Sequence, residues 1–92
     1  MNGPQVREWA EALASRLQAD TPNAENFHPL IFKAYARALG REPSPLELDE
    51  ASDFLQAQFR RYGTDEKSDA RFLALTDFCQ VLFGLNEFAY EN

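Results

Sequence analysis

Three acidic side chains in the middle of the chain have a spacing that could support chemistry. Glu47, Glu50 and Asp53 recur every third residue, which places them on one face if this stretch is helical. Such a face could hold a cation or a basic partner. The same positions also suit the positive end of a helix dipole and a solvated surface, and we favour this second interpretation. Residues 64–69 lack the central glycine and the alternate ligands of a calcium loop.

The single histidine and the single cysteine are the other residues with chemical capacity. A zinc site needs several good ligands, and His28 has only scattered carboxylates near it in the sequence. A nucleophilic cysteine needs an activating base, but Cys79 lies in an apolar run far from His28. We therefore expect Cys79 to be a small core residue. One cysteine also excludes an internal disulfide.

The rest of the sequence offers no catalytic pattern. It contains no Gly-rich phosphate loop and no Cys-x-x-Cys-His haem attachment site. We predict that this chain alone is not an enzyme and has no catalytic residue, cofactor or metal. Four aromatic residues could stack on sugars, but their helical spacing favours the core: Trp9, Tyr35, Phe54 and Tyr62. Phe27 and Tyr90, expected in a loop and a tail, are better candidates for contact with a ligand.

Composition and charge restrict the class of protein. The 92 residues carry 15 acidic and 9 basic side chains, a net charge of -6. This balance disfavours nucleic-acid binding and docking on anionic membranes, both of which use basic surfaces. No stretch approaches the roughly 20 apolar residues of a membrane span, so we predict no membrane insertion. The 45% hydrophobic and 13% aromatic content is sufficient for one small packed domain.

The periodicity of the apolar residues predicts an all-α, four-helix bundle-like single domain. The helices are expected at about residues 4–19, 26–39, 45–62 and 69–83. In the first helix, one stripe carries the apolar residues: Val6, Trp9, Ala10, Leu13 and Leu17. The fourth helix is apolar on nearly all sides, so we place it at the centre of the bundle.

Proline, serine and glycine mark the boundaries of these helices. Pro4 suits the first turn of the first helix, and Pro29 must lie in the first turn of the second. Gly40 is expected to end the second helix in the left-handed conformation. Ser44, followed by Pro45 and Glu47, has the form of a capping box at the start of the third.

Gly84 is expected to end the fourth helix. Residues 85–90 would then fold back as a short C-terminal turn or tail, with Phe88 and Tyr90 packed on the core. This prediction rests on glycine as the usual residue just after a helix end.

Two segments of the chain together resemble a known family. The pattern is Tyr35-x-x-Ala38-Leu39-Gly40-Arg41-x-Pro43-Ser44-Pro45-x-Glu47-Leu48 and, later, Leu82-x-x-x-Asn86-Glu87-Phe88-x-Tyr90. It resembles the C-terminal part of a planctomycete-specific domain of unknown function. That domain occurs in large exported proteins, often with planctomycete cytochrome c-type domains and sometimes with lectin-like carbohydrate modules. Gly84-Leu85 stand where the family usually has Asn-Ser.

The resemblance implies a structural or interaction module, excised from the C-terminal end of an exported or cell-envelope parent protein. Its partners would be upstream domains of that parent, or a second copy through a face exposed by excision. The alternative is a helical cover that contributes to an active site or carbohydrate-binding surface built by upstream domains. A second family, a helical repeat domain of bacterial surface proteins similar in part to phycobilisome linkers, shares the Leu39-Gly40-Arg41-Glu42-Pro43 turn.

The residues that carry the resemblance are our candidate structural or interaction motif: Gly40, Arg41, Pro43, Ser44, Pro45, Glu47, Asn86, Glu87, Phe88 and Tyr90. The family has no established catalytic residues, so none is transferred. Arg41 could bond backbone carbonyls or a carboxylate such as Glu87 across the bundle. This pairing is a hypothesis about how the two segments meet.

Overall fold

A computed structural model describes residues 3–22, 24, 26–63 and 69–91, with side chains described as far as Leu85. These residues form four helices: α1 (Pro4–Asp20), α2 (His28–Leu39), α3 (Pro45–Tyr62) and α4 (Ala70–Glu91). No strand occurs within the described ranges. The predicted all-α, four-helix bundle-like fold is therefore confirmed.

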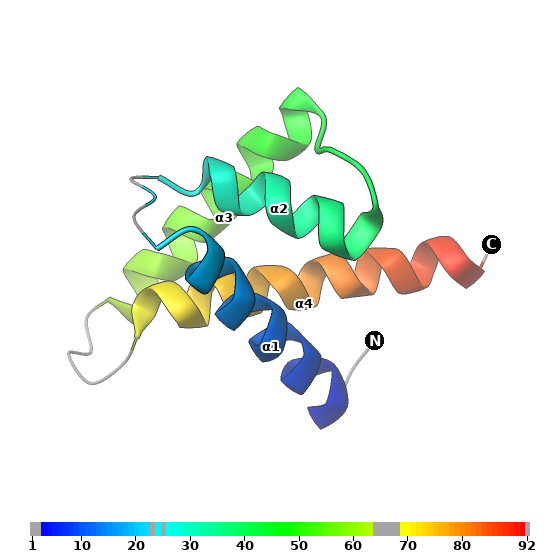
Figure 1. Ribbon diagram of the computed structural model, residues 1–92, viewed down its shortest axis with the longest axis horizontal. Coiled ribbons are helices and arrows are strands. Elements are labelled where there is room, and N and C mark those ends of the chain that lie inside the picture. Colours follow the sequence, from blue (N-terminus) through cyan, green and yellow to red (C-terminus); the bar gives the residue numbers. More distant parts are fainter. Residues whose placement is uncertain (1–2, 23, 25, 64–68, 92) are drawn as a thin grey trace.

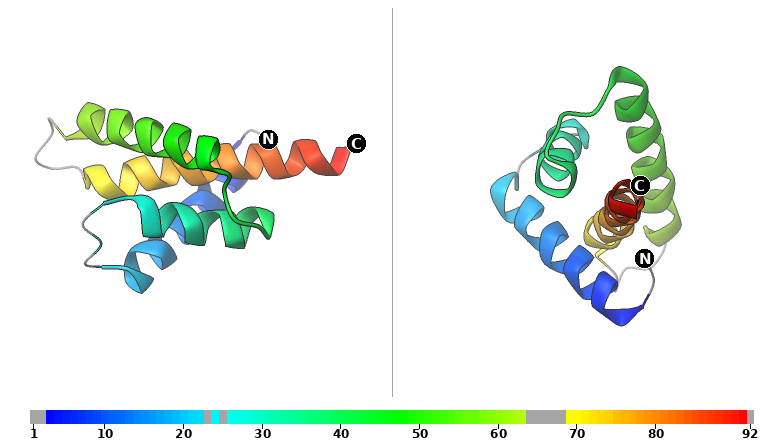
Figure 2. Two further views of the ribbon diagram at one scale, coloured as in Figure 1. Left: turned by 90° about the horizontal axis from the view of Figure 1, so that it is seen from above. Right: turned by 90° about the vertical axis from the view of Figure 1, so that its right-hand side faces the viewer.

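The longest helix, α4, lies between the others. α1 and α3 cross it obliquely on opposite sides, and α2 covers a third side (Figure 1). The end-on view in Figure 2 shows the three helices arranged around α4. Among the described residues the backbones of α1 and α3 do not pack on each other, whereas each packs extensively on α4. The predicted central position of the fourth helix is thus confirmed, and it explains why α4 is apolar on several sides.

The packing of α1 on α4 depends on small side chains. Ala10 and Ala14 are fully buried, which lets the two helix backbones approach closely. Trp9, predicted to lie in the buried stripe, is instead 44% exposed. An indole is too large for this close crossing, and Trp9 packs edge-on against Phe83 at its border, with ring centroids 6.5 Å apart.

The boundaries of α2 and α3 follow local chemistry. α2 begins at His28 rather than at residue 26, and the His28 N–H donates to the Asn26 side-chain oxygen at 2.9 Å. Gly40 ends α2 with φ of 69°, the predicted left-handed conformation. At the start of α3, the Ser44 hydroxyl accepts from the Glu47 N–H at 3.1 Å, and the Glu47 carboxylate accepts from the Ser44 N–H at 2.9 Å. The predicted capping box is therefore present.

The predicted end of the fourth helix is wrong, because α4 continues through Gly84 to Glu91. Gly84 does not have a positive φ, and no proline follows it. A glycine inside a helix costs only about 1 kcal/mol relative to alanine, which the helix tolerates. Residues 85–90 therefore form no turn, and the end of α4 projects beyond the other helices (Figures 1 and 2). The side chains of Phe88 and Tyr90, predicted to pack on the core, lie outside the described residues.

The core contains Cys79 as predicted. Its side chain is fully buried, and burial raises the pKa of the thiol to about 12. Tyr35 is also buried, in tilted contact with Phe78, and Phe54 makes a second tilted contact with the same ring. Across the described part of the chain, no helix combines the length and apolarity needed to cross a bilayer.

Candidate interaction site

The turn between α2 and α3 is held by a charged pair. Arg41 donates to both carboxylate oxygens of Glu47, Nη1 to Oε1 at 2.8 Å and Nη2 to Oε2 at 2.9 Å. The Arg41 guanidinium also lies over the Tyr35 ring, 5.4 Å from its centroid. The hydrogen bonds from Arg41, and then those from Ser44, lower the pKa of Glu47 to about 2. The hydrogen bonds of Glu47 with Arg41 and with Ser44 therefore hold the turn in one conformation.

The sequence predicted a bond between Arg41 and Glu87, but the Glu87 side chain lies outside the described residues. Within the described part of the chain, the carboxylate partner of Arg41 is Glu47. A bidentate pair uses the planar fork of the guanidinium on one carboxylate. Arg41 therefore stabilises the turn itself. The sequence also predicted that Arg41 donates to a backbone carbonyl, and its Nη1 donates to the Glu42 carbonyl oxygen at 3.1 Å.

The first half of α3 and part of α4 line one hollow of about 150 Å³, next to Tyr35 of α2. Its floor and walls come from α2, α3 and α4: Tyr35, Glu47, Glu50, Ala51, Phe54, Phe78, Val81, Leu82 and Leu85. Val81 and Leu85 lie one helical turn apart and are each 48% exposed. Two carboxylates border a surface that is otherwise apolar. Such a hollow can receive an apolar side chain from another protein surface.

The motif residues have two different positions relative to this hollow. Gly40, Pro43, Ser44 and Pro45 build the turn, and Pro43 is buried there. Among the motif residues with described side chains, Glu47 in the first turn of α3 lines the hollow and the others do not. The remaining motif residues, Asn86, Glu87, Phe88 and Tyr90, lie on the last turns of α4, with side chains outside the described residues. The start of α3, which directly follows the turn, and α4 therefore lie side by side around the hollow.

A polar cluster around Asp77 is the main feature that the sequence reasoning missed. Asp77 accepts hydrogen bonds from Arg7 Nη1, Gln58 Nε2 and the Tyr62 hydroxyl, each at 2.7 Å. Its side chain is only 15% exposed. Arg7 comes from α1, and Gln58 and Tyr62 come from α3, so one carboxylate on α4 joins both flanking helices. The signal available in the sequence was a single charged residue inside the apolar run of the fourth helix.

The protonation of this cluster follows from its hydrogen bonds. Burial by itself would raise the pKa of Asp77, but the hydrogen bonds from Arg7, Tyr62 and Gln58 outweigh burial and lower it. Donation to Asp77 is the main reason that the pKa of Tyr62 is raised. An ionised carboxylate whose oxygens are already used by protein donors has little capacity left for a substrate. We therefore interpret the cluster as a structural one.

The acidic face of α3 has no such organisation. Asp49, Glu50 and Asp53 are exposed, as a solvated face requires. In the described ranges, no group of three His, Cys, Asp or Glu side chains is placed to hold a metal ion.

Comparisons of the chain with protein-family models, curated proteins and solved structures found no match. The resemblance to a planctomycete-specific domain therefore stays a prediction from the residue pattern.

Proposed function

We propose that this chain is a non-enzymatic interaction module of a larger, exported protein. It packs against other domains of that protein through the surface around Val81 and Leu85. The observation that carries the proposal is the exposure of these two aliphatic side chains, 48% each, on the part of α4 next to its projecting end. Fully burying an exposed aliphatic side chain yields about 1.5–3 kcal/mol, so covering the half of each side chain that is still exposed contributes roughly half of that.

The fixed turn supports this role by providing a rigid border for the surface. The capping box and the Arg41–Glu47 pair hold Glu47 at the edge of the hollow. A preformed surface loses little conformational entropy when it binds, which favours docking. The resemblance of the turn and of the α4 end to one family agrees with a shared docking role for both segments.

The size of the native product in its source cells tests the first half of the proposal. An antibody raised against this chain should detect a band several times larger than 10.5 kDa on an immunoblot. A band near 10.5 kDa would identify a free-standing protein and contradict the proposed parent.

A double substitution tests the docking surface. Val81→Ser with Leu85→Ser, made in the larger protein, should separate the module from its neighbours and expose it to limited proteolysis. Leu46→Ser is the matched control, because Leu46 is 67% exposed on α3 and does not line the hollow. Equal protease resistance of the double variant and the control would refute docking through this surface.

A further inference from the structure

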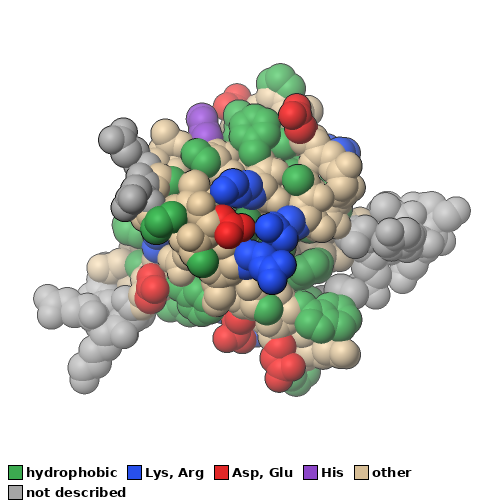
Figure 3. All heavy atoms as spheres, in the orientation of Figure 1, with side chains coloured by type: hydrophobic (Ala, Val, Ile, Leu, Met, Phe, Trp, Pro, Cys, Tyr) green, Lys and Arg blue, Asp and Glu red, His purple; other side chains and the backbone are tan. Residues whose placement is uncertain are grey.

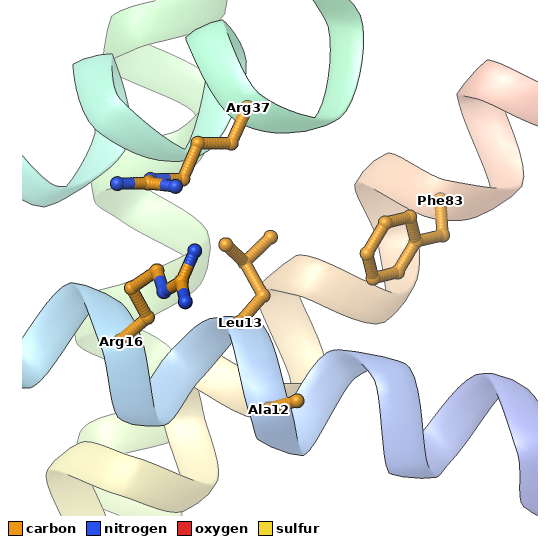
Figure 4. A pocket seen from close by; sticks show the side chains of 5 residues that line it. All are labelled: Ala12, Leu13, Arg16, Arg37 and Phe83. Atoms are coloured by element: carbon orange, nitrogen blue, oxygen red, sulfur yellow. The ribbon is translucent and has the colours of Figure 1, made fainter.

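Two arginines from neighbouring helices converge over a second hollow, on the side of the molecule where α1 meets α2. The hollow has a volume of about 260 Å³, and its lining residues are Ala12, Leu13, Arg16, Arg37 and Phe83. Figure 4 shows the guanidinium group of Arg37 above that of Arg16, with Leu13 next to them and Phe83 beyond Leu13. Like charges placed in this way favour an anion between them.

The positive charge at this hollow is only partly compensated. Arg37 Nη2 lies 3.2 Å from Asp20 Oδ2, and Lys33 Nζ donates to the Asp20 carbonyl at 3.5 Å. Arg16 is exposed and makes no hydrogen bond or ion pair with any residue that the structure describes. Figure 3 shows basic side chains gathered around an acidic one on this face. A protein with a net charge of -6 therefore presents a local excess of positive charge here.

The other half of the hollow is apolar and leads to an exposed aromatic residue. Leu13 and Phe83 are half-buried, and Trp9, 44% exposed, packs edge-on against Phe83. Trp and Arg are the residue types most enriched where protein interfaces gain their affinity. A ligand that fits this surface needs an anionic group for the arginines and an apolar group for Leu13 and Phe83.

We propose that this hollow binds an acidic segment of a partner protein, in which a carboxylate lies next to a large apolar side chain. The carboxylate would take the Arg16 guanidinium as a bidentate partner and compete with Asp20 for Arg37. The apolar side chain would cover Leu13 and extend toward Trp9. This surface lies apart from the one around Val81 and Leu85, so the inference does not depend on the proposed function.

The charge and shape of the site favour a protein segment over a membrane or a nucleic acid. Anionic lipid surfaces are bound by clusters of about 4–8 Lys and Arg residues, more than are gathered here. A net charge of -6 would also repel a polyanion outside this hollow. A free inorganic anion would leave the apolar half uncovered. A carboxylate beside an apolar group matches both halves of the site.

The test uses the full chain labelled with nitrogen-15 and a synthetic acidic peptide of about twelve residues that contains Glu, Phe and Leu. Titration followed by NMR should shift resonances of α1, of α2 and of Phe83 in a saturable way. Arg16→Gln should weaken the affinity about tenfold, since it removes a charge-assisted pair. Arg61→Gln is the matched control, because Arg61 is exposed on α3 and lies outside the hollow.

A second variant makes the test independent of any general loss of charge. Asp20→Asn removes the intramolecular competitor of Arg37 and should tighten peptide binding. Equal weakening by Arg16→Gln and Arg61→Gln would overturn the proposal, as would unchanged affinity for a peptide with Gln in place of Glu. Binding to phosphatidylserine vesicles without binding to the peptide would also overturn it.

Discussion

The turn between α2 and α3 and the middle of α4 are each held by an arginine–carboxylate pair, but the partners come from different distances along the chain. Arg41 and Glu47 are six residues apart, whereas Arg7 and Asp77 are 70 residues apart. The first pair is exposed and closes a turn, with Arg41 and Glu47 side chains 51% and 28% accessible. The second is largely covered, with Asp77 only 15% accessible.

The difference is between a conformation fixed by local hydrogen bonds and a cluster that depends on tertiary packing. The hydrogen bonds of the turn join residues that are close in the sequence, so a short stretch of sequence determines its conformation. The Asp77 cluster exists only when α1 and α3 are both packed on α4. We therefore expect substitutions in the cluster to weaken the whole fold, and substitutions in the turn to have smaller, local effects.

The largest expected effect is that of Asp77→Ala. It removes the acceptor for Arg7 and Gln58 and should lower the free energy of unfolding by about 2 kcal/mol. Chemical denaturation followed by circular dichroism measures this change. Asp53→Ala, an exposed carboxylate on the neighbouring helix, should stay within about 0.5 kcal/mol of the unsubstituted chain. A similar stability for both variants would show that the cluster does not hold the helices together.

Alanine at Gly40, which ends α2, and at Gly84, which lies inside α4, should have opposite effects. Gly40→Ala forces a side chain into a left-handed position with φ of 69° and should destabilise the protein by about 1 kcal/mol. Gly84→Ala lies in a helix, has no atom within 4 Å of the added Cβ, and should stabilise it by up to about 1 kcal/mol. Thermal melting distinguishes the two. A destabilising Gly84→Ala would argue against the continuous helix through residue 84.

The smallest expected effect is the pH dependence contributed by Glu47. Its pKa is lowered from 4.5 to about 2 in the folded chain, mainly by Arg41. A lowered pKa means that the pair stabilises the fold above about pH 4.5, and that this contribution is lost as the pH falls toward 2. The stability difference between the unsubstituted chain and Glu47→Gln should therefore shrink over that window. A difference that is constant with pH would show that the pair contributes nothing.

Most of the fold could be predicted because its signals are short-range. Gly40 placed the end of α2 correctly, and Pro45 with the Ser44–Glu47 box placed the start of α3 correctly, whereas the predicted start of α2 was two residues too early. The error at Gly84 has a physical cause, because glycine permits the left-handed conformation that ends many helices but does not impose it. Gly40 is followed closely by two prolines, and Gly84 is followed by residues that continue a helix. Trp9 was misplaced because periodicity carries no information on how closely two helices approach.

The candidate site could be predicted only in part. The sequence singled out the turn and the α4 end as related, but the carboxylate partner found for Arg41, Glu47, lies at the start of α3 and not on α4. The Asp77 cluster was missed because its donors are 15 to 70 residues away, and only the packed fold brings them together. The Arg16–Arg37 hollow was missed for the same reason, since neither arginine belongs to a recognisable motif.

The central place of α4 has a consequence for how the protein is made. α4 is the last of the four helices to be synthesised, yet it is the main surface on which α1 and α3 bury their apolar residues. Until α4 has left the ribosome, Leu17 and Leu55 lack most of the core that covers them. The domain therefore completes its fold only after α4 has been synthesised, and a nascent chain that stops before Ala70 exposes two unprotected apolar stripes to chaperones and proteases.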